Sequence, residues 1–222
     1  MKRARTQRAE RARLWPPAWV AMEVQRFPRL AGYLESLPKG LASYPECRAK
    51  GSIFRTAFEG RAWNDEYATL PLALRTVLEE PPLPNAWIPE TVSVAAHHAV
   101  ADVEGMTDEG VIAWGEASLG RLARSPMYRV VSFVASPQLL LKSAPLSWKL
   151  LHQGMTLRVQ TSATAARLEL EHPAKVWTEL VHRVTAAAFR TIIGLAGGQK
   201  PTVELARVGA TGGVYEAAWG VS

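Results

Sequence analysis

The sequence between Met155 and Trp219 decides the fold. Residues 155–171 read MTLRVQTSATAARLELE, residues 202–219 read TVELARVGATGGVYEAAW, and a helical segment over 175–195 separates them. Each quoted stretch alternates apolar and polar residues on both sides of a small-residue or glycine-rich turn, which predicts two β-hairpins. The order β-β-α-β-β therefore indicates a small antiparallel sheet with one helix across it.

The first hairpin is predicted from a period of two. One face of its strands is apolar throughout: Met155, Leu157, Val159, Ala166, Leu168 and Leu170. The other face is polar, and there we expect Arg158 and Glu169 to form an opposite-charge pair. An antiparallel sheet with one solvated face has this pattern, whereas buried parallel strands are apolar on both faces.

An amphipathic helix is predicted from about Lys175 to Leu195. Pro173 has no N–H for a strand ladder, so it ends the hairpin before the helix. The stripe that we expect to be buried repeats every 3.6 residues: Trp177, Leu180, Val181, Val184, Ala188, Ile192 and Leu195. Gly197 and Gly198 are suitable residues to end it.

The front two-thirds of the chain is predicted to be helical. The segments with helical periodicity are 27–37, 52–60, 70–79, 89–103, 108–122 and two that meet at Ser136-Pro137 and run on to 151. The predicted fold class is α+β, a helical N-terminal two-thirds packed on a C-terminal antiparallel sheet. The prolines of segment 80–86 favour an extended conformation and make it a candidate sub-boundary.

Composition limits the class of protein. The chain has 222 residues, 48% hydrophobic and 21% charged, which suits one α+β domain over residues 22–222. Cys47 is the single cysteine, so no internal disulfide forms, and a reducing compartment, the cytoplasm, is expected. With five histidines besides, the chain has few ligands for structural zinc, and we expect neither a metal nor a cofactor.

The positive charge is concentrated at the N-terminus. Six basic residues and one acidic residue in positions 1–13 account for +5 of the net charge of +6. We expect residues 1–21 to be a basic, disordered tail, or a stretch upstream of a true start at Met22. The alternative that stays open is an arm that binds nucleic acid or an anionic surface.

The sequence carries no pattern for a targeting or membrane segment. Leu14–Met22 is too short, and too interrupted by Pro16 and Pro17, for the apolar region of a secretory signal. No apolar stretch approaches the ~20 residues that a membrane span needs.

His97-His98 is the only histidine pair. Neighbouring helical residues point about 100° apart, so the two rings do not readily share one metal. His98 and Asp102 are four residues apart and share a helix face, which is compatible with an oriented general base. The plainer interpretation is one buried and one surface histidine on an amphipathic helix.

Two further motifs have structural interpretations. Cys47 precedes Arg48 and Lys50, whose charges favour a thiolate, but no histidine is near in sequence to activate it, so a buried apolar cysteine is the plainer interpretation. The glycines of 209–213 lead into a strand and lack a following lysine, which predicts a hairpin turn and not a phosphate loop.

Four segments are similar to a family of uncharacterised myxobacterial proteins. They are LESLP (34–38), YPECRAKGS (44–52), SPMYR (125–129) and YEAAW (215–219), and the similarity covers roughly residues 27–219. That family distantly resembles the ligand-binding fold shared by vinyl-4-reductase-type domains, haem-nitric-oxide-binding domains and transport-particle subunits. The resemblance implies a helical half with a C-terminal antiparallel sheet, small or lipidic ligands, and action in dimers and signalling assemblies.

The sequence departs from these relatives at their binding motifs. The Tyr-x-Ser-x-Arg element of the haem-binding branch is absent, and no cysteine follows Cys47, whereas vinyl-4-reductase-type domains carry cysteines near the last hairpin. The resemblance therefore implies the fold and an apolar pocket, but neither haem nor a cysteine-ligated metal.

The leading hypothesis is a non-enzymatic sensor or adaptor that binds an apolar small molecule or a protein partner, with a homodimer as one assembly. Aromatic and histidine side chains near apolar segments are candidates for the pocket wall. The residues expected to contact the ligand are His97, His98, Trp114, Tyr128 and Trp148. The alternatives are an enzyme that uses His98 and Asp102 as a base, and nucleic-acid binding through the N-terminal arm.

Overall fold

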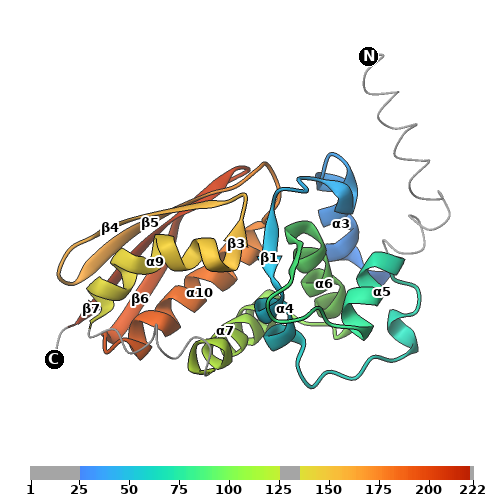
Figure 1. The fold of residues 1–222 in the computed structure, drawn as a ribbon, viewed down its shortest axis with the longest axis horizontal. Helices are drawn as coiled ribbons and strands as arrows, with labels where there is room; N and C mark the ends of the chain where they lie inside the picture. The colour runs from blue at the N-terminus through green and yellow to red at the C-terminus, as the bar shows by residue number, and fades with distance from the viewer. Residues whose placement is uncertain (1–25, 126–135, 221–222) are drawn as a thin grey trace, which may run out of the picture.

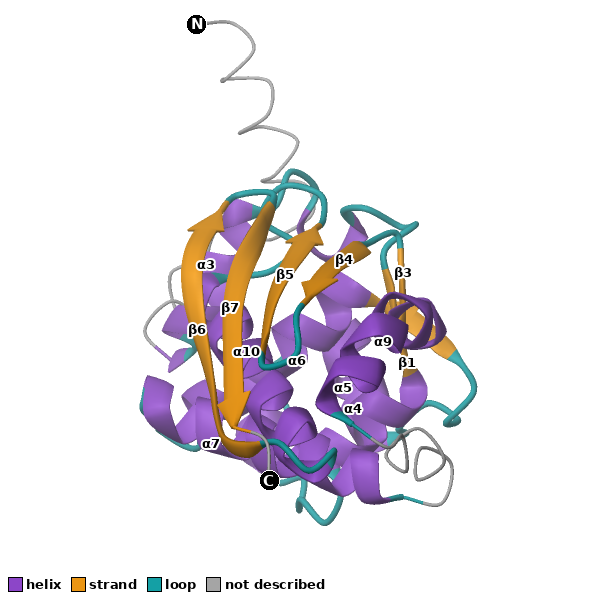
Figure 2. Cartoon of the chain, turned by 90° about the vertical axis from the view of Figure 1, so that its left-hand side faces the viewer, coloured by secondary structure: helices purple, strands orange, loops and turns teal. Residues whose placement is uncertain are grey.

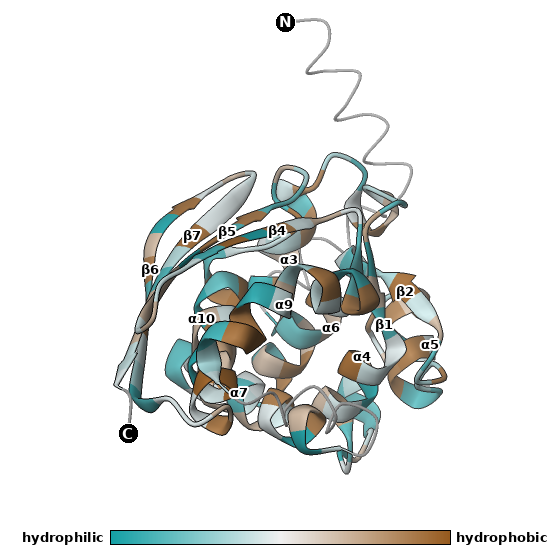
Figure 3. Cartoon of the chain, turned by 60° about the vertical axis from the view of Figure 1, so that its left-hand side comes forward, coloured by the Kyte–Doolittle hydropathy of each residue, from teal (hydrophilic) through white to brown (hydrophobic). Residues whose placement is uncertain are grey.

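The computed structural model describes residues 26–125 and 136–220, in which a helical half and a four-stranded sheet lie side by side (Figure 1). The helical half contains α3 (Pro28–Ser36), α4 (Gly51–Phe58), α5 (Leu72–Glu79), α6 (Glu90–Val103), α7 (Asp108–Arg124) and the 3₁₀ turns η1 (Gly40–Ala42) and η2 (Asp65–Tyr67). Two helices, α9 (Pro137–Leu151) and α10 (Glu179–Leu195), cover one face of the sheet (Figure 3). The predicted α+β class is confirmed.

The C-terminal sheet has the antiparallel order β4-β5-β7-β6, visible in Figure 2. Its strands are β4 (Thr156–Thr161), β5 (Ala165–Glu171), β6 (Gln199–Gly209) and β7 (Gly212–Gly220), so residues 209–213 are a hairpin turn as predicted. The alternation is confirmed, because Leu157, Leu168 and Leu170 are buried while Arg158 is exposed.

In the charge pair on the outer face, the partner of Arg158 lies two residues beyond the predicted one. Arg158 stands opposite Glu169 in the strand register, yet its guanidinium pairs diagonally with Glu171. Glu169 pairs instead with Arg167 on its own strand, at 2.9 Å. Long side chains reach diagonal neighbours across antiparallel strands, so register alone does not select the partner.

Helix α10 begins four residues later than predicted. Thr178 caps it by accepting a hydrogen bond from the backbone N–H of Val181 at 3.3 Å, and the positive φ of Lys175 keeps the preceding segment out of the helix. The buried surface is also broader than the predicted stripe, because the helix packs on both the sheet and α7. Leu195, expected to be buried, is 37% exposed.

A second, small sheet has the order β2-β1-β3 and was not predicted. Its strands are β1 (Arg48–Lys50), β2 (Trp87–Pro89) and β3 (His152–Gln153), and Ala49 pairs with both Ile88 and His152. The proline-rich segment lies next to it, since the N–H of Gly51 donates to the carbonyl of Ala86 at 2.8 Å. This sheet brings the start of α6 close to the end of α9.

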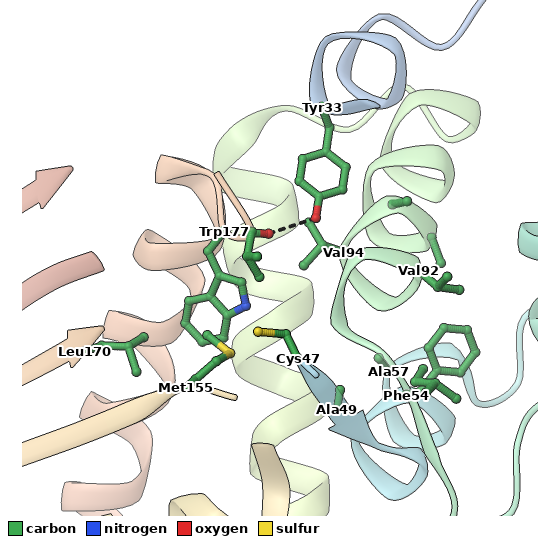
Figure 4. Packing of buried hydrophobic residues seen from close by; sticks show 14 of the residues in the cluster. Tyr33, Cys47, Ala49, Phe54, Ala57, Val92, Val94, Met155, Leu170 and Trp177 are labelled. Atoms are coloured by element: carbon green, nitrogen blue, oxygen red, sulfur yellow. Dashed lines mark hydrogen bonds between the residues drawn. The ribbon is translucent and has the colours of Figure 1, made fainter. Parts of the chain in front are cut away.

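One contiguous hydrophobic core extends from Phe27 to Trp219 and joins the two halves (Figure 4). Trp177 of the sheet side and Cys47, the residue before β1, meet in it, and the hydroxyl of Tyr33 donates to the carbonyl of Val176 at 2.8 Å. Within residues 26–125 and 136–220, every helix falls short of the length or hydrophobicity that crossing a bilayer requires.

Candidate functional site

A cavity of about 270 Å³ lies where the helical half meets α9 and α10. Its described wall draws on α4, α6, α7, α9, α10 and the short strand β3. Most of the side chains are apolar, among them Ile53, Val94, Leu119, Leu141, Val184 and Phe189. The cavity volume is near the lower end of pockets that hold drug-sized molecules, roughly 300–1,000 Å³.

Among the described residues of the cavity wall, Glu90 is the one that carries a carboxylate. It is the first residue of α6 and is 3% exposed. Its backbone N–H donates to the carbonyl of Cys47 at 2.9 Å, which holds Glu90 against the segment before β1. Its carboxylate accepts hydrogen bonds from the indole Nε1 of Trp177 at 2.8 Å and from Nδ1 of His152 at 3.2 Å. Burial alone would raise the pKa of Glu90. The charge of His152 and these two hydrogen bonds lower the pKa by more than burial raises it, so the pKa of Glu90 lies below its ordinary value.

Trp148 lies beside this carboxylate cluster. Its ring stacks on His152 with centroids 4.3 Å apart and meets Trp177 edge-on at 5.8 Å. The side chain lines the cavity and is 8% exposed, and within the described residues its Nε1–H has no acceptor. A buried donor without a partner costs about 1–3 kcal/mol, so this N–H is an incomplete part of the wall.

His97 also lines the cavity. Its ring packs against Phe58 at 4.8 Å and Trp114 at 5.0 Å, and its Nδ1 donates to the carbonyl of Ser93 at 2.8 Å. Burial lowers the pKa of His97, so the ring is neutral near pH 7. Because the proton must be on Nδ1 to reach a carbonyl, Nε2 carries a lone pair.

His98 lines another part of the same cavity. It is 5% exposed, its ring lies 5.3 Å from that of Tyr33, and its Nε2 lies 3.4 Å from the hydroxyl of Thr178. Burial lowers the pKa of His98 to about 4, and electrostatic repulsion from Arg29, and from His97 when that ring is protonated, acts in the same direction. His98 is therefore a neutral, buried wall residue, whereas His97 beside it is half-buried.

The structure brings three of the five predicted contact residues together. His97, His98 and Trp148 all line the cavity. Trp114 supports His97 from behind and donates from Nε1 to the carbonyl of Ala57 at 2.9 Å. Tyr128 lies outside the described residues. A role of these residues in ligand contact stays a prediction.

The His98–Asp102 arrangement differs from the one expected. The carboxylate of Asp102 accepts from the backbone N–H of Leu30 at 3.0 Å and lies 3.6 Å from the guanidinium of Arg29. In the described part of the chain no hydrogen bond joins it to His98. Asp102 therefore ties α6 to α3 and does not orient the imidazole.

A second buried polar chain lies under the sheet. Nε2 of His172 and Nε2 of His182 are 3.0 Å apart, and Nδ1 of His182 is 2.6 Å from the hydroxyl of Tyr215. Nδ1 of His172 donates to the carbonyl of Pro173 at 2.8 Å, which leaves its Nε2 to accept from His182. Tyr215 then donates to His182, and every group is satisfied with both rings neutral.

Sequence reasoning missed Glu90, His152 and Trp177 as site residues. Glu90 after a proline is typical of a solvated first turn of a helix, where acidic residues are common. Its burial depends on the small sheet, whose strands are too short to show periodicity. The sequence pattern places Trp177 on the packed face of the helix, near apolar segments, but does not single it out as a ligand contact, although its indole N–H requires an acceptor when buried.

Cys47 is not an activated thiol. It is completely buried, and burial raises its pKa to about 12, so the expected influence of Arg48 and Lys50 is outweighed. Among the described residues, no group of three or more His, Cys, Asp or Glu side chains is arranged to hold a metal ion.

Comparison with known proteins yields structural neighbours only. No protein-family model and no curated protein matches the sequence. The fold is similar to a Cs H-NOX mutant that carries an unnatural amino acid, with a TM-score of 0.55 and 13% identity over 77% of this chain and 96% of that one. It is also similar to an Fe(II) unliganded H-NOX protein mutant from K. algicida, with a TM-score of 0.50 and 10% identity over the same shares.

These matches support the fold part of the predicted resemblance. At such low identity they show the fold alone, and the similarity to the myxobacterial family stays a prediction.

Haem, which the haem-binding branch of this fold implies, does not fit the described wall. A neutral histidine nitrogen is present at His97, but haem also carries two carboxylates. No lysine or arginine is among the described residues that line the cavity. The carboxylate of Glu90, in contrast, does line it. Burying further carboxylates there without a cation is costly.

Proposed function

We propose that this chain is a non-enzymatic sensor or adaptor domain that holds a small apolar molecule in the cavity between its helical half and α9–α10. The observation that carries the proposal is the cavity itself, about 270 Å³ with a mainly apolar wall. Protein interiors leave few voids of this size, because the residues around a void lose dispersion contacts. An apolar cavity of ~150 Å³ already takes up benzene.

The fold likeness to H-NOX proteins supports the same class of function by analogy of fold alone. The enzyme alternative has less support, because Asp102 is engaged by Arg29 and Leu30, and in the described part of the chain no carboxylate is hydrogen-bonded to His98. The nucleic-acid alternative concerns residues 1–21, which lie outside the described residues.

A cavity-filling variant tests the proposal. Ala144 lines the cavity one helical turn before Trp148, so Ala144→Phe places a ring in the space where a ligand would lie. We expect the neutral dye phenylnaphthylamine to bind the wild-type chain with increased fluorescence, and Ala144→Phe to weaken this binding by about tenfold or more, since a tenfold loss needs only ~1.4 kcal/mol.

Leu146→Phe is the matched control. Leu146 is on the same helix, is 70% exposed and is not among the cavity residues, so its substitution should leave dye affinity within about twofold. Equal binding by the two variants, or loss of binding in both, would contradict a ligand site in the cavity.

A further inference from the structure

We infer that the ligand is an uncharged, mainly hydrocarbon molecule with one hydrogen-bond-accepting oxygen, bound with that oxygen at the indole N–H of Trp148. This inference rests on the proposed function and adds the chemical class of the ligand. Two independent features of the wall carry it: the indole N–H of Trp148, which has no acceptor among the described residues, and the distribution of charge around Glu90.

The first feature is an unmade hydrogen bond. Trp148 is held between His152 and the core, and at 8% exposure it has little access to bulk water. Its Nε1–H is the buried side-chain donor among the described cavity residues that has no acceptor. An indole N–H donates only, so the group that completes this site has to be an acceptor such as a carbonyl or ether oxygen.

The second feature is that the described wall contains neither lysine nor arginine, and that its one charged histidine, His152, is already paired with Glu90. A ligand carboxylate or phosphate would lose its hydration without meeting a lysine or arginine, and it would lie in the same cavity as the ionised Glu90. Glu90 does not favour a ligand cation either, because its charge is already paired with that of His152 and its other oxygen accepts from Trp177. The remaining wall is apolar and matches a hydrocarbon body.

A ligand series with one skeleton separates these features. Tetralin, α-tetralone, tetralin carboxylate and aminotetralin differ only in the polar group, and each is titrated against bound phenylnaphthylamine. We expect tetralin and α-tetralone to displace the dye and both charged analogues to fail at about 100-fold higher concentration, since a buried unpaired charge costs several kcal/mol. Haemin is expected to give no specific haem absorption band with the protein.

The role of Trp148 is tested by Trp148→Phe, which removes the donor and keeps an aromatic ring. The advantage of α-tetralone over tetralin should fall by roughly five- to tenfold in the variant, the worth of one hydrogen bond of ~1 kcal/mol or slightly more. In the wild-type chain, the indole N–H resonance that Trp148→Phe removes should move on addition of α-tetralone and stay in place with tetralin. This second readout needs no ligand binding by the variant.

The outcomes distinguish the inference from the function on which it rests. If neither the dye nor any tetralin analogue binds at the cavity, the proposed function fails. If tetralin carboxylate, aminotetralin or haemin binds as tightly as α-tetralone, or if the Trp148 resonance does not respond to the ketone, the inference on ligand class is overturned while the cavity remains a binding site.

Discussion

At the scale of single residues, Glu90 shows how a charged side chain is kept in a core. Its carboxylate is surrounded by hydrogen-bond donors from two distant segments, Trp177 and His152. A buried carboxylate is tolerated when hydrogen bonds from the protein replace those it made with water. Removing one member of such a cluster leaves the other buried polar groups without a partner. Glu90 therefore fixes the positions of two rings at the cavity wall.

We expect Glu90→Leu to destabilise the fold by about 3 kcal/mol, because it leaves two buried N–H donors without an acceptor. Glu90→Gln should cost less, since the amide oxygen still accepts one of the two hydrogen bonds. Urea unfolding followed by circular dichroism measures both. Glu79→Leu, at an exposed position of α5, is the control and should change the unfolding free energy by no more than ~0.5 kcal/mol. A similar loss in Glu79→Leu and Glu90→Leu would contradict the role of the buried carboxylate.

Individual site residues could be predicted only in part from the sequence. His97, His98 and Trp148 were selected because their residue types occur beside apolar segments, and the fold brings them to one wall. Glu90 was not selected, because a glutamate in the first turn of a helix has the same local pattern whether solvent or β1 covers it. Burial of such a residue depends on contacts between segments far apart in sequence.

At the scale of elements, α7 and α10 pack unusually closely at Gly115. A Cβ at this position would collide with a methyl group of Val184 on α10, a β-branched side chain with little rotamer freedom. Gly120, one and a half turns further along α7, faces only the flexible end of Arg124 and the methyl group of Thr191. The two glycines have the same helix propensity and different surroundings.

This contrast gives a matched pair of substitutions. Gly120→Ala should be neutral or stabilise the protein by up to ~1 kcal/mol, because alanine favours the helix. Gly115→Ala should destabilise it by about 1–3 kcal/mol through overpacking, and Val184→Ala should relieve the loss in the double mutant. Thermal unfolding of the four proteins measures this, and equal effects of the two glycine substitutions would argue against close packing at Gly115.

Elements were predictable where their pattern is local. The alternation in 155–171 and 202–219 and the helical repeats of α6 and α9 are each contained in one stretch, and the structure confirms them. The strands β1, β2 and β3 have two or three residues each, too few for a period, and their pairing joins positions 49, 88 and 152. The start of α10 was misplaced because the capping role of Thr178 competes with an apolar pattern that begins before it.

At the scale of the whole molecule, buried neutral histidines make stability depend on pH. Burial lowers the pKa of both His98 and His182 to about 4, whereas an unfolded histidine titrates near 6.5. Below pH ~6.5 the unfolded chain takes up protons that these two rings do not, so the stability present at neutral pH is lost as the pH falls toward 4. Burial raises the pKa of Asp102, which acts in the opposite sense.

We expect the free energy of unfolding to fall between pH 7 and pH 5, where most carboxylates stay ionised. Each histidine contributes on the order of 2 kcal/mol to this loss at pH 5. Urea unfolding at several pH values measures the slope, and His98→Gln should make it shallower by removing one titrating group. An unchanged slope in His98→Gln would show that this ring is not held neutral in the fold.

The edge strand β6 of the C-terminal sheet has a consequence for assembly. Its pairing with β7 shifts register between Gln199 and Thr202 and again between Leu205 and Arg207, and Pro201 within it has no N–H. Strand-to-strand addition needs an evenly spaced row of free donors and acceptors, and bulges and proline interrupt that row. The β6 edge is thereby a poor template for sheet growth, so two copies of this chain are not expected to merge their sheets at this edge into one continuous ribbon.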